Sequence, residues 1–284
     1  MRSQQDSLEM PAWHGKVQLS YQRQADKTAM CGCFTQSPFR IQKPFYPEGN
    51  AICHTILLHT AGGIVGGDRL SVSLDLARDS HVFLTTAAAN KLYKSNGQTA
   101  IQDGVINQAA GSVLEYFPQE TIVFDGAEYR QSLRVNLAEN AVWCGWEILR
   151  FGRTARGEKF HSGNWRGATE IWQGDELLWG DRQWLPGDPN VFASWNGLNN
   201  QAVVSSLALV GLEISDEQIT EFRETMGQIS QGLGGITQLP KGVLCRYRGN
   251  SSTEVKRWFL SLLKEWRSLY SPQTLTLPRV WQSY

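Results

Sequence analysis

Cysteine and histidine are the side chains of this 284-residue chain that could bind a soft or borderline metal ion, and each occurs five times. Cys31 and Cys33 stand two residues apart in a strand-like segment, so their side chains would point to one face about 7 Å apart. The chain contains neither a C-x-x-C pair nor an H-E-x-x-H motif, so a closed zinc site is not indicated. Cys31, Cys33 and His59 are therefore weak candidate ligands, and burial of both cysteines on a strand face is the more common alternative.

The sequence contains no recognisable combination of a nucleophile, a base and an orienting residue. No G-x-S-x-G motif occurs, and Cys144 lies in a Trp-rich apolar segment, where burial raises the pKa of a thiol and makes it inert. Glu115 and Glu120 could form a pair of carboxylates, but their spacing does not show that they face each other. They could equally be hydrogen-bonded corner residues or line a polar cavity. The residues indicate no catalytic constellation, and a hydrolase of unknown class is the least favoured hypothesis.

A glycine-rich stretch with an acidic end lies between two strand-like runs: Gly62, Gly63, Gly66, Gly67 and Asp68. The outer glycines have the spacing of a phosphate-binding loop, but Asp68 and Arg69 stand where that loop has Lys and Ser or Thr. A carboxylate there would repel phosphate, and no helix pattern follows to offer amide groups to an anion. We interpret the stretch as a packed strand–turn–strand in which glycine permits close backbone approach.

Charged residues gather in the polar segment 152–167, which is predicted to be a loop. Arg153, Arg156 and Glu158 stand beside two glycines and could form a structured ionic loop. A solvated loop is one interpretation, and a partner surface or an ion path is the other. Residue chemistry alone leaves these about equal.

The composition is that of an ordinary folded protein, with 41% hydrophobic and 19% charged residues. The 27 basic and 27 acidic residues cancel, so nothing favours a nucleic acid or an anionic membrane as a partner. The polar N-terminus lacks an apolar signal sequence, and no run of 18 apolar residues could span a membrane. An odd number of cysteines without a regular framework predicts reduced thiols in a cytoplasmic protein.

Period-two alternation of apolar residues recurs along the first two thirds of the chain and predicts many strands separated by short turns. Helical spacing occurs only in the last third. Ser215 and Gln218 form a capping-box pattern before one predicted helix, and Ser251 and Glu254 form another before a second. No Pro- or Ser-rich linker divides the chain. We expect a mainly β, β-dominated α+β fold, with a flexible N-terminus (1–12) and a single domain (13–284).

Six segments in a fixed order carry a resemblance to a known family: GGIVGGDRL (62–70), TTAAANKLY (85–93), LEYFPQETI (114–122), FGR (151–153), GEKF (157–160) and PRVW (278–281). No single segment is diagnostic, but the ordered set is specific. The chain resembles the UreD family of urease accessory proteins, also called UreH. The resemblance covers most of the chain, from about residue 15 onwards.

This resemblance implies a non-enzymatic nickel-insertion chaperone with a helix-like stack of β-strands and a pair of helices. Its implied partners are the apo-urease subunits, a helical UreF-type protein and, through UreF, a nickel-carrying UreG-type GTPase. No cofactor would be stably bound, but nickel(II) would pass transiently through an internal polar passage. Thr85, Thr86, Glu115 and Glu120 would offer oxygen ligands that a partly hydrated ion can touch and leave. The alternative is a nickel-storing or metal-sensing protein that uses Cys31, Cys33 and histidines.

Overall fold

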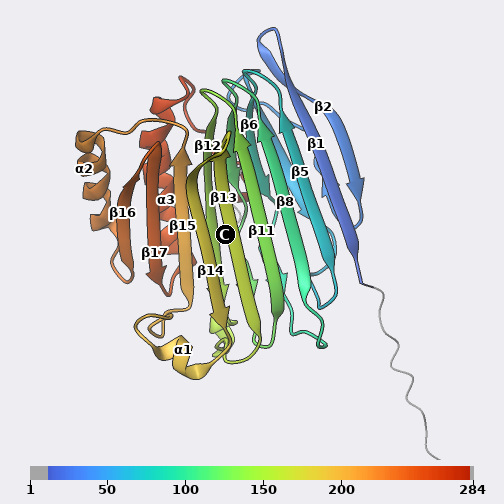
Figure 1. Cartoon of the computed structure of the whole chain (residues 1–284), viewed down its shortest axis with the longest axis vertical. Coiled ribbons are helices and arrows are strands. Elements are labelled where there is room, and N and C mark those ends of the chain that lie inside the picture. Colours follow the sequence, from blue (N-terminus) through green and yellow to red (C-terminus); the bar gives the residue numbers. More distant parts are fainter. Residues whose placement is uncertain (1–11, 282–284) are drawn as a thin grey trace, which may run out of the picture.

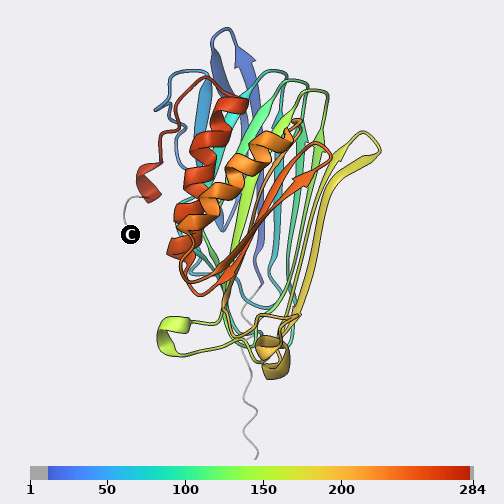
Figure 2. The same cartoon turned by 90° about the vertical axis from the view of Figure 1, so that its left-hand side faces the viewer.

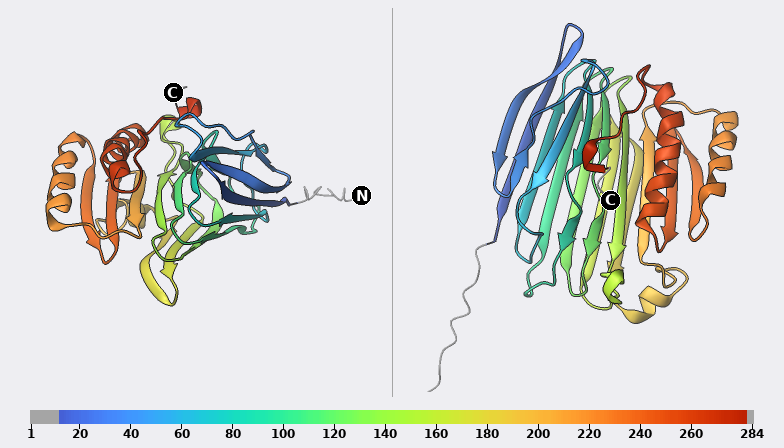
Figure 3. Two further views of the ribbon diagram at one scale, coloured as in Figure 1. Left: turned by 90° about the horizontal axis from the view of Figure 1, so that it is seen from above. Right: turned by 180° about the vertical axis from the view of Figure 1, so that it is seen from behind.

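The computed structural model describes residues 12–281 (Figure 1). The predicted flexible N-terminus therefore lies outside the described residues, apart from Ala12. Two large sheets and one layer of helices form the molecule. Figure 3 shows the sheets face to face in the view from above, with α2 and α3 on one side only.

Seven strands form the first sheet, in the order β14 (Glu176–Pro186), β13 (Asn164–Gln173), β11 (Glu128–Leu137), β8 (Ala100–Gln108), β5 (Arg69–Leu76), β1 (His14–Gln24) and β2 (Lys27–Gln36). Ten strands form the second sheet, along the path β16 (Leu233–Leu239), β17 (Gly242–Gly249), β15 (Val203–Val210), β12 (Val142–Phe151), β9 (Val113–Phe117), β6 (His81–Thr86), β4 (Ile52–His59) and β3 (Phe39–Ile41), with β10 (Thr121–Val123) and β7 (Asn90–Leu92) attached beside β12.

The chain passes repeatedly from one sheet to the other, so that each coil places one strand in each sheet. Strands β1, β5, β8, β11 and β13 pair in parallel in the first sheet, and β4, β6, β9 and β12 pair in parallel in the second. Antiparallel strands close one end of the stack, with β14 beside β13 and β15, β17 and β16 beyond β12. The predicted β-dominated, helix-like stack is confirmed.

Side-chain alternation creates two separate cores. Leu70, Val72 and Leu74 of β5 point into the space between the sheets, where they join one large buried cluster. On the other face of the second sheet, a second cluster packs against the helices. Because the second sheet is buried on both faces, its strands read as nearly continuous apolar runs.

Residues 12–281 contain three α-helices: α1 (Pro189–Ala193), α2 (Asp216–Glu224) and α3 (Ser252–Trp266). Helices α2 and α3 are the two that the sequence predicts, and α1 was not predicted. The capping box of α2 is complete, because Ser215 and Gln218 each accept the other's backbone N–H. The box predicted for α3 is only half formed. The Ser251 hydroxyl accepts the Glu254 N–H, but the Glu254 carboxylate instead accepts from the Ser230 and Gln231 amides.

Short 3₁₀ turns complete the fold: Thr154–Arg156, Thr225–Gln228, Arg267–Leu269 and Arg279–Trp281. The predicted loop 152–167 ends earlier than expected, because β13 begins at Asn164. Trp165 is buried in register with Tyr129 of β11, and this tertiary packing extends the strand beyond its local signal. No helix in residues 12–281 is long and apolar enough to cross a membrane.

Candidate functional site

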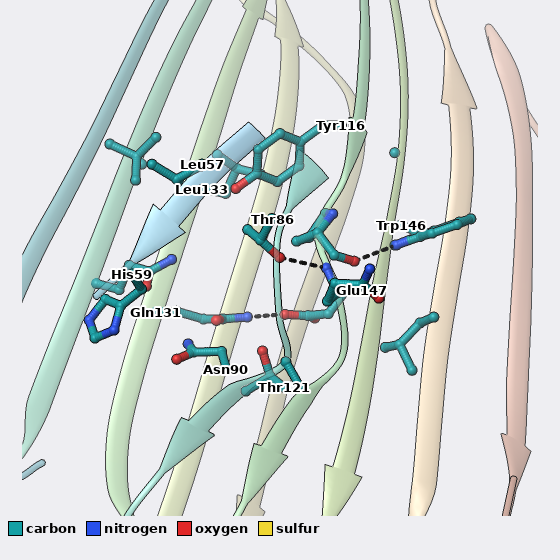
Figure 4. Close-up of a pocket in the computed structure, with 18 of the residues that line it drawn as sticks. Leu57, His59, Thr86, Asn90, Tyr116, Thr121, Gln131, Leu133, Trp146 and Glu147 are labelled. Atoms are coloured by element: carbon teal, nitrogen blue, oxygen red, sulfur yellow. Dashed lines mark hydrogen bonds between the residues drawn. The ribbon is translucent and has the colours of Figure 1, made fainter. Parts of the chain in front are cut away.

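A cavity of about 410 Å³ lies between the two sheets (Figure 4). Its walls come from β5, β8, β11 and β13 on one side and from β4, β6, β9 and β12 on the other. Glycines in both walls keep the larger side chains close to the sheets. A Cβ atom at Gly145 would lie 2.4 Å from the Trp143 ring, and one at Gly104 would lie 2.8 Å from Leu133 Cδ1. The ring and the methyl group can occupy these positions only because both residues are glycine.

Glu147 is the acidic side chain that faces this cavity, from the middle of β12. The side-chain amide of Gln131, from β11 in the opposite sheet, donates a hydrogen bond to Glu147 Oε1. The pKa of Glu147 is raised to about 7, because burial raises it more than the Gln131 hydrogen bond lowers it, and nearby Asp181 adds a smaller increase. The carboxyl group can therefore exchange a proton near neutral pH.

Neutral oxygen atoms make up much of the remaining polar lining. Thr86 Oγ1 accepts a hydrogen bond from the backbone N–H of Gln119 at 2.8 Å, and Tyr116 points its hydroxyl towards the same space. Burial raises the pKa of Tyr116 to about 12, so the phenol keeps its proton. None of the described residues that line the cavity is a cysteine. The site therefore offers one titratable acid among weak, neutral ligands.

His59 adds a nitrogen to the cavity lining. Its Nδ1 lies 3.1 Å from the Ala61 carbonyl oxygen, which can only accept a hydrogen bond, so Nδ1 carries the proton. Burial lowers the pKa of His59, and the ring is therefore neutral at pH 7. Its Nε2 is buried and has no hydrogen-bond partner among residues 12–281. The predicted candidate ligand thus presents a free lone pair.

The two predicted passage threonines face opposite sides of the second sheet. Thr86 lines the cavity, whereas Thr85 Oγ1 donates to the Phe117 carbonyl at 2.6 Å and accepts from Trp281 Nε1 at 3.0 Å on the helix side. Successive side chains of a strand point to opposite faces, so adjacent residues cannot both line one space from the same strand.

Glu115 also lies on the helix side, where it is buried in a polar network. It accepts from the Tyr270 hydroxyl at 2.8 Å, and its carboxylate lies 3.2 Å from His81 Nε2 and 3.3 Å from Arg267 Nη1. Glu120 is not part of this network and lies 3.6 Å from Arg150 Nε. Of the four predicted passage residues, only Thr86 therefore borders the cavity.

The two candidate cysteine ligands are exposed rather than buried, contrary to the commoner expectation. They lie on β2 at the edge of the first sheet, where a β-bulge leaves Cys31 without a register partner. In the part of the chain that the structure describes, no group of three or more His, Cys, Asp or Glu side chains could hold a metal ion. Cys31 and Cys33 therefore do not join His59 in one site.

The glycine-rich stretch is a crowded turn, as the sequence predicts, and it borders the cavity. A Cβ atom at Gly63 would lie 2.6 Å from the Lys91 carbonyl, and one at Gly66 would lie 2.6 Å from the Gln98 carbonyl. Gly67 has φ = +92°, a conformation that other residues rarely adopt. These three positions therefore require glycine.

Asp68 holds this turn together from a buried position. Its two carboxylate oxygens accept the backbone amides of Trp13 at 2.8 Å and of Val65 at 3.0 Å. Gly62, at the start of the stretch, is less constrained, because a Cβ atom there would meet its nearest neighbour at 3.9 Å. The role of Asp68 in the structure is thus to satisfy backbone donors.

The charged segment after β12 is a structured ionic loop. The Arg153 guanidinium pairs with Glu158, whose carboxylate also accepts the backbone amides of Arg153 at 3.1 Å and Asp125 at 3.2 Å. These contacts hold the pKa of Glu158 below its usual value, against the opposing effect of burial. Arg156 is exposed on the adjacent 3₁₀ turn.

Sequence reasoning missed two hydrogen-bonded residues of the cavity lining, Glu147 and Gln131. A signal for Glu147 was present, because it is the one acidic residue in an apolar strand. Burying an isolated carboxylate is costly, so such a residue points to a functional or paired position. Gln131 gave no comparable signal, since exposed and cavity-facing glutamines look alike in a strand.

Taken together, the fold and the site define a two-sheet parallel β-stack that encloses a polar cavity. A family model described as "UreD urease accessory protein" matches residues 14–282. The chain belongs to this UreD family of urease accessory proteins.

Curated relatives agree with the family over nearly the whole chain. A Picosynechococcus protein named "Urease accessory protein UreD" is 77% identical over 272 residues, which cover 96% of this chain and 95% of the relative. A Nostoc protein of the same name is 50% identical and covers 99% of this chain and 100% of its own length. A Synechocystis protein of that name is 41% identical and covers 88% and 93%, respectively.

Proposed function

We propose that this UreD-family chain is a non-catalytic scaffold in urease maturation whose inter-sheet cavity conducts nickel(II) towards urease. It would bind the urease apoprotein and a UreF-type protein, and UreF would bring a UreG-type GTPase. The supporting observation is the cavity itself, which places one titratable carboxylate, Glu147, among neutral oxygens and the imidazole of His59.

This set of ligands suits transit better than storage. A divalent cation needs some negative charge to enter a protein interior, and a deprotonated Glu147 supplies it. Thiolates would bind nickel strongly and slow its release, whereas threonine, glutamine and tyrosine oxygens bind it weakly. An ion path requires binding that is favourable enough for entry yet weak enough for departure. The predicted passage is therefore retained, but with Glu147, Gln131 and Thr86 in its lining.

The test is urease activation in cells that co-express urease, this chain and the other accessory proteins. Glu147→Gln preserves shape but removes the charge, and Ala89→Trp adds bulk to the cavity lining without changing charge. Both should lower the nickel content of purified urease while the accessory complex still forms. Glu213→Gln, at an exposed position before α2, is the matched control and should load nickel normally. Normal nickel content with both cavity variants would refute conduction through this cavity.

A further inference from the structure

The outer face of the first sheet carries a row of basic side chains in direct register. The register across neighbouring strands is Arg69 on β5, Ile101 on β8, Arg130 on β11, Arg166 on β13 and Trp184 on β14. We call these five residues the basic row. The three arginines and Trp184 are exposed, and helices α2 and α3 lie on the far side of the second sheet (Figures 1 and 2).

This arrangement is unfavourable for the isolated chain. Arg130 and Arg166 are direct neighbours on parallel strands, about 5 Å apart in the hydrogen-bonding direction. Like charges directly opposite each other destabilise a sheet. Within residues 12–281, no ion pair involves Arg69, Arg130 or Arg166. Locally unfavourable contacts such as this like-charge pair occur in natural proteins mainly at functional sites.

Aromatic residues on the same face give it the composition of a protein-binding surface. The Arg166 guanidinium lies 4.9 Å from the centre of the Trp184 ring, and that of Arg134 lies 4.8 Å from the centre of the Trp172 ring. Trp184 is 63% exposed. Tryptophan and arginine are the residue types enriched in the energetically dominant positions of interfaces.

The size and shape of the face fit one folded partner. Seven strands span about 29 Å, and the four residues of each strand that point outwards span about 20 Å, which gives roughly 600 Å². A standard interface uses about 800 Å² on each side. Acidic residues such as Asp103 and Glu170 are interspersed beyond the basic row, and they would repel a continuous phosphate backbone. The surface therefore fits a protein with localised carboxylates rather than a nucleic acid.

We propose that the basic row and the adjoining outer face dock a carboxylate-rich surface of the folded urease apoprotein. This inference rests on the proposed function, in which the chain binds that apoprotein. The exposed face of a seven-stranded sheet offers a broad surface to a large folded protein, whereas a single amphipathic helix packs into a groove.

Arg130→Glu tests the proposal without weakening the fold. It replaces a like-charge pair with opposite charges in register, so the melting temperature of the full chain should not fall. Binding to immobilised urease apoprotein, measured by biolayer interferometry, should nevertheless weaken by about tenfold or more, since like charges would now meet across the interface. Wild-type affinity should fall between about 50 and 200 mM salt, and the variant should show a smaller salt dependence. Lys264→Glu, on the exposed side of α3, is the matched control and should bind like wild type.

Each outcome decides between the proposals. If the wild-type chain does not bind urease apoprotein, the proposed function fails and this inference fails with it. If wild type binds and Arg130→Glu binds within about twofold of it, only the docking surface is refuted. Two other results would show that the assigned occupant is wrong. In the first, Arg130→Glu still binds urease apoprotein but no longer binds a UreF-type protein. In the second, it still binds urease apoprotein and loses only its binding to DNA.

Discussion

Replacing Glu147 with glutamine should stabilise the protein at alkaline pH while impairing its function. The folded pKa of about 7 lies above the ordinary value of 4.5, because burial in the inter-sheet space penalises the charged carboxylate. The contribution of this group to stability is therefore fully present below pH 4.5 and is lost as the pH rises through 7. The interval between the two pKa values corresponds to about 3 kcal/mol.

Glutamine keeps the shape of the side chain and has no charge to desolvate. We therefore expect the difference in unfolding free energy between Glu147→Gln and wild type to be small at pH 4.5. It should rise to about 3 kcal/mol in favour of the variant at pH 8. Reversible urea unfolding, followed by tryptophan fluorescence at a series of pH values, measures this difference.

The control for this comparison is Glu213→Gln, which removes the same formal charge from an exposed position. Its difference from wild type should stay near zero across the pH range. A difference for Glu147→Gln that does not change between pH 4.5 and pH 8 would falsify the reasoning, because burial of a titrating carboxylate requires that dependence. A fall in nickel loading together with a rise in stability would show that the buried charge is kept for function.

Two further predictions concern packing. Gly66→Val should abolish soluble expression or lower stability by more than about 3 kcal/mol, because its Cβ atom would overlap a backbone carbonyl, whereas Gly62→Ala has room and should change thermal unfolding little. Trp281→Ala should lower the free energy of unfolding by about 3–5 kcal/mol, because this side chain is only 8% exposed and stacks on Trp146. The control Trp195→Ala changes a side chain that is 69% exposed and should be nearly neutral in the same urea titration. Equal effects within either pair would contradict the packing described here.

Patterns within single segments were sufficient for much of the fold. The alternation along β5 and the helical stripe of α3 correctly indicate which faces are buried, because each depends only on the local period of the backbone. Ser251 shows the limit of such patterns. The carboxylate of its capping partner Glu254 instead accepts hydrogen bonds from backbone N–H groups of a loop more than twenty residues away in the chain. No local motif predicts such a contact.

The site could be predicted only in part. Of the predicted passage residues, Thr86 lines the cavity, whereas Thr85 and Glu115 face the helices. Strand alternation already separates the two threonines, whereas assigning either face to the cavity requires knowledge of which sheet covers it. Glu147 was visible as an acid in an apolar strand, yet Gln131 became its partner only when the opposite sheet packed over it.

The sequence by itself determined the family, the β-dominated architecture and the need for glycine at the crowded turn, because these follow from ordered motifs, local periodicity and backbone sterics. Only the tertiary structure decided which polar residues share a cavity, raised the pKa of Glu147 and aligned Arg69, Arg130 and Arg166 on one face. The physical reason is that these properties depend on register between strands and on desolvation between sheets. Both arise from pairings between residues far apart in the chain.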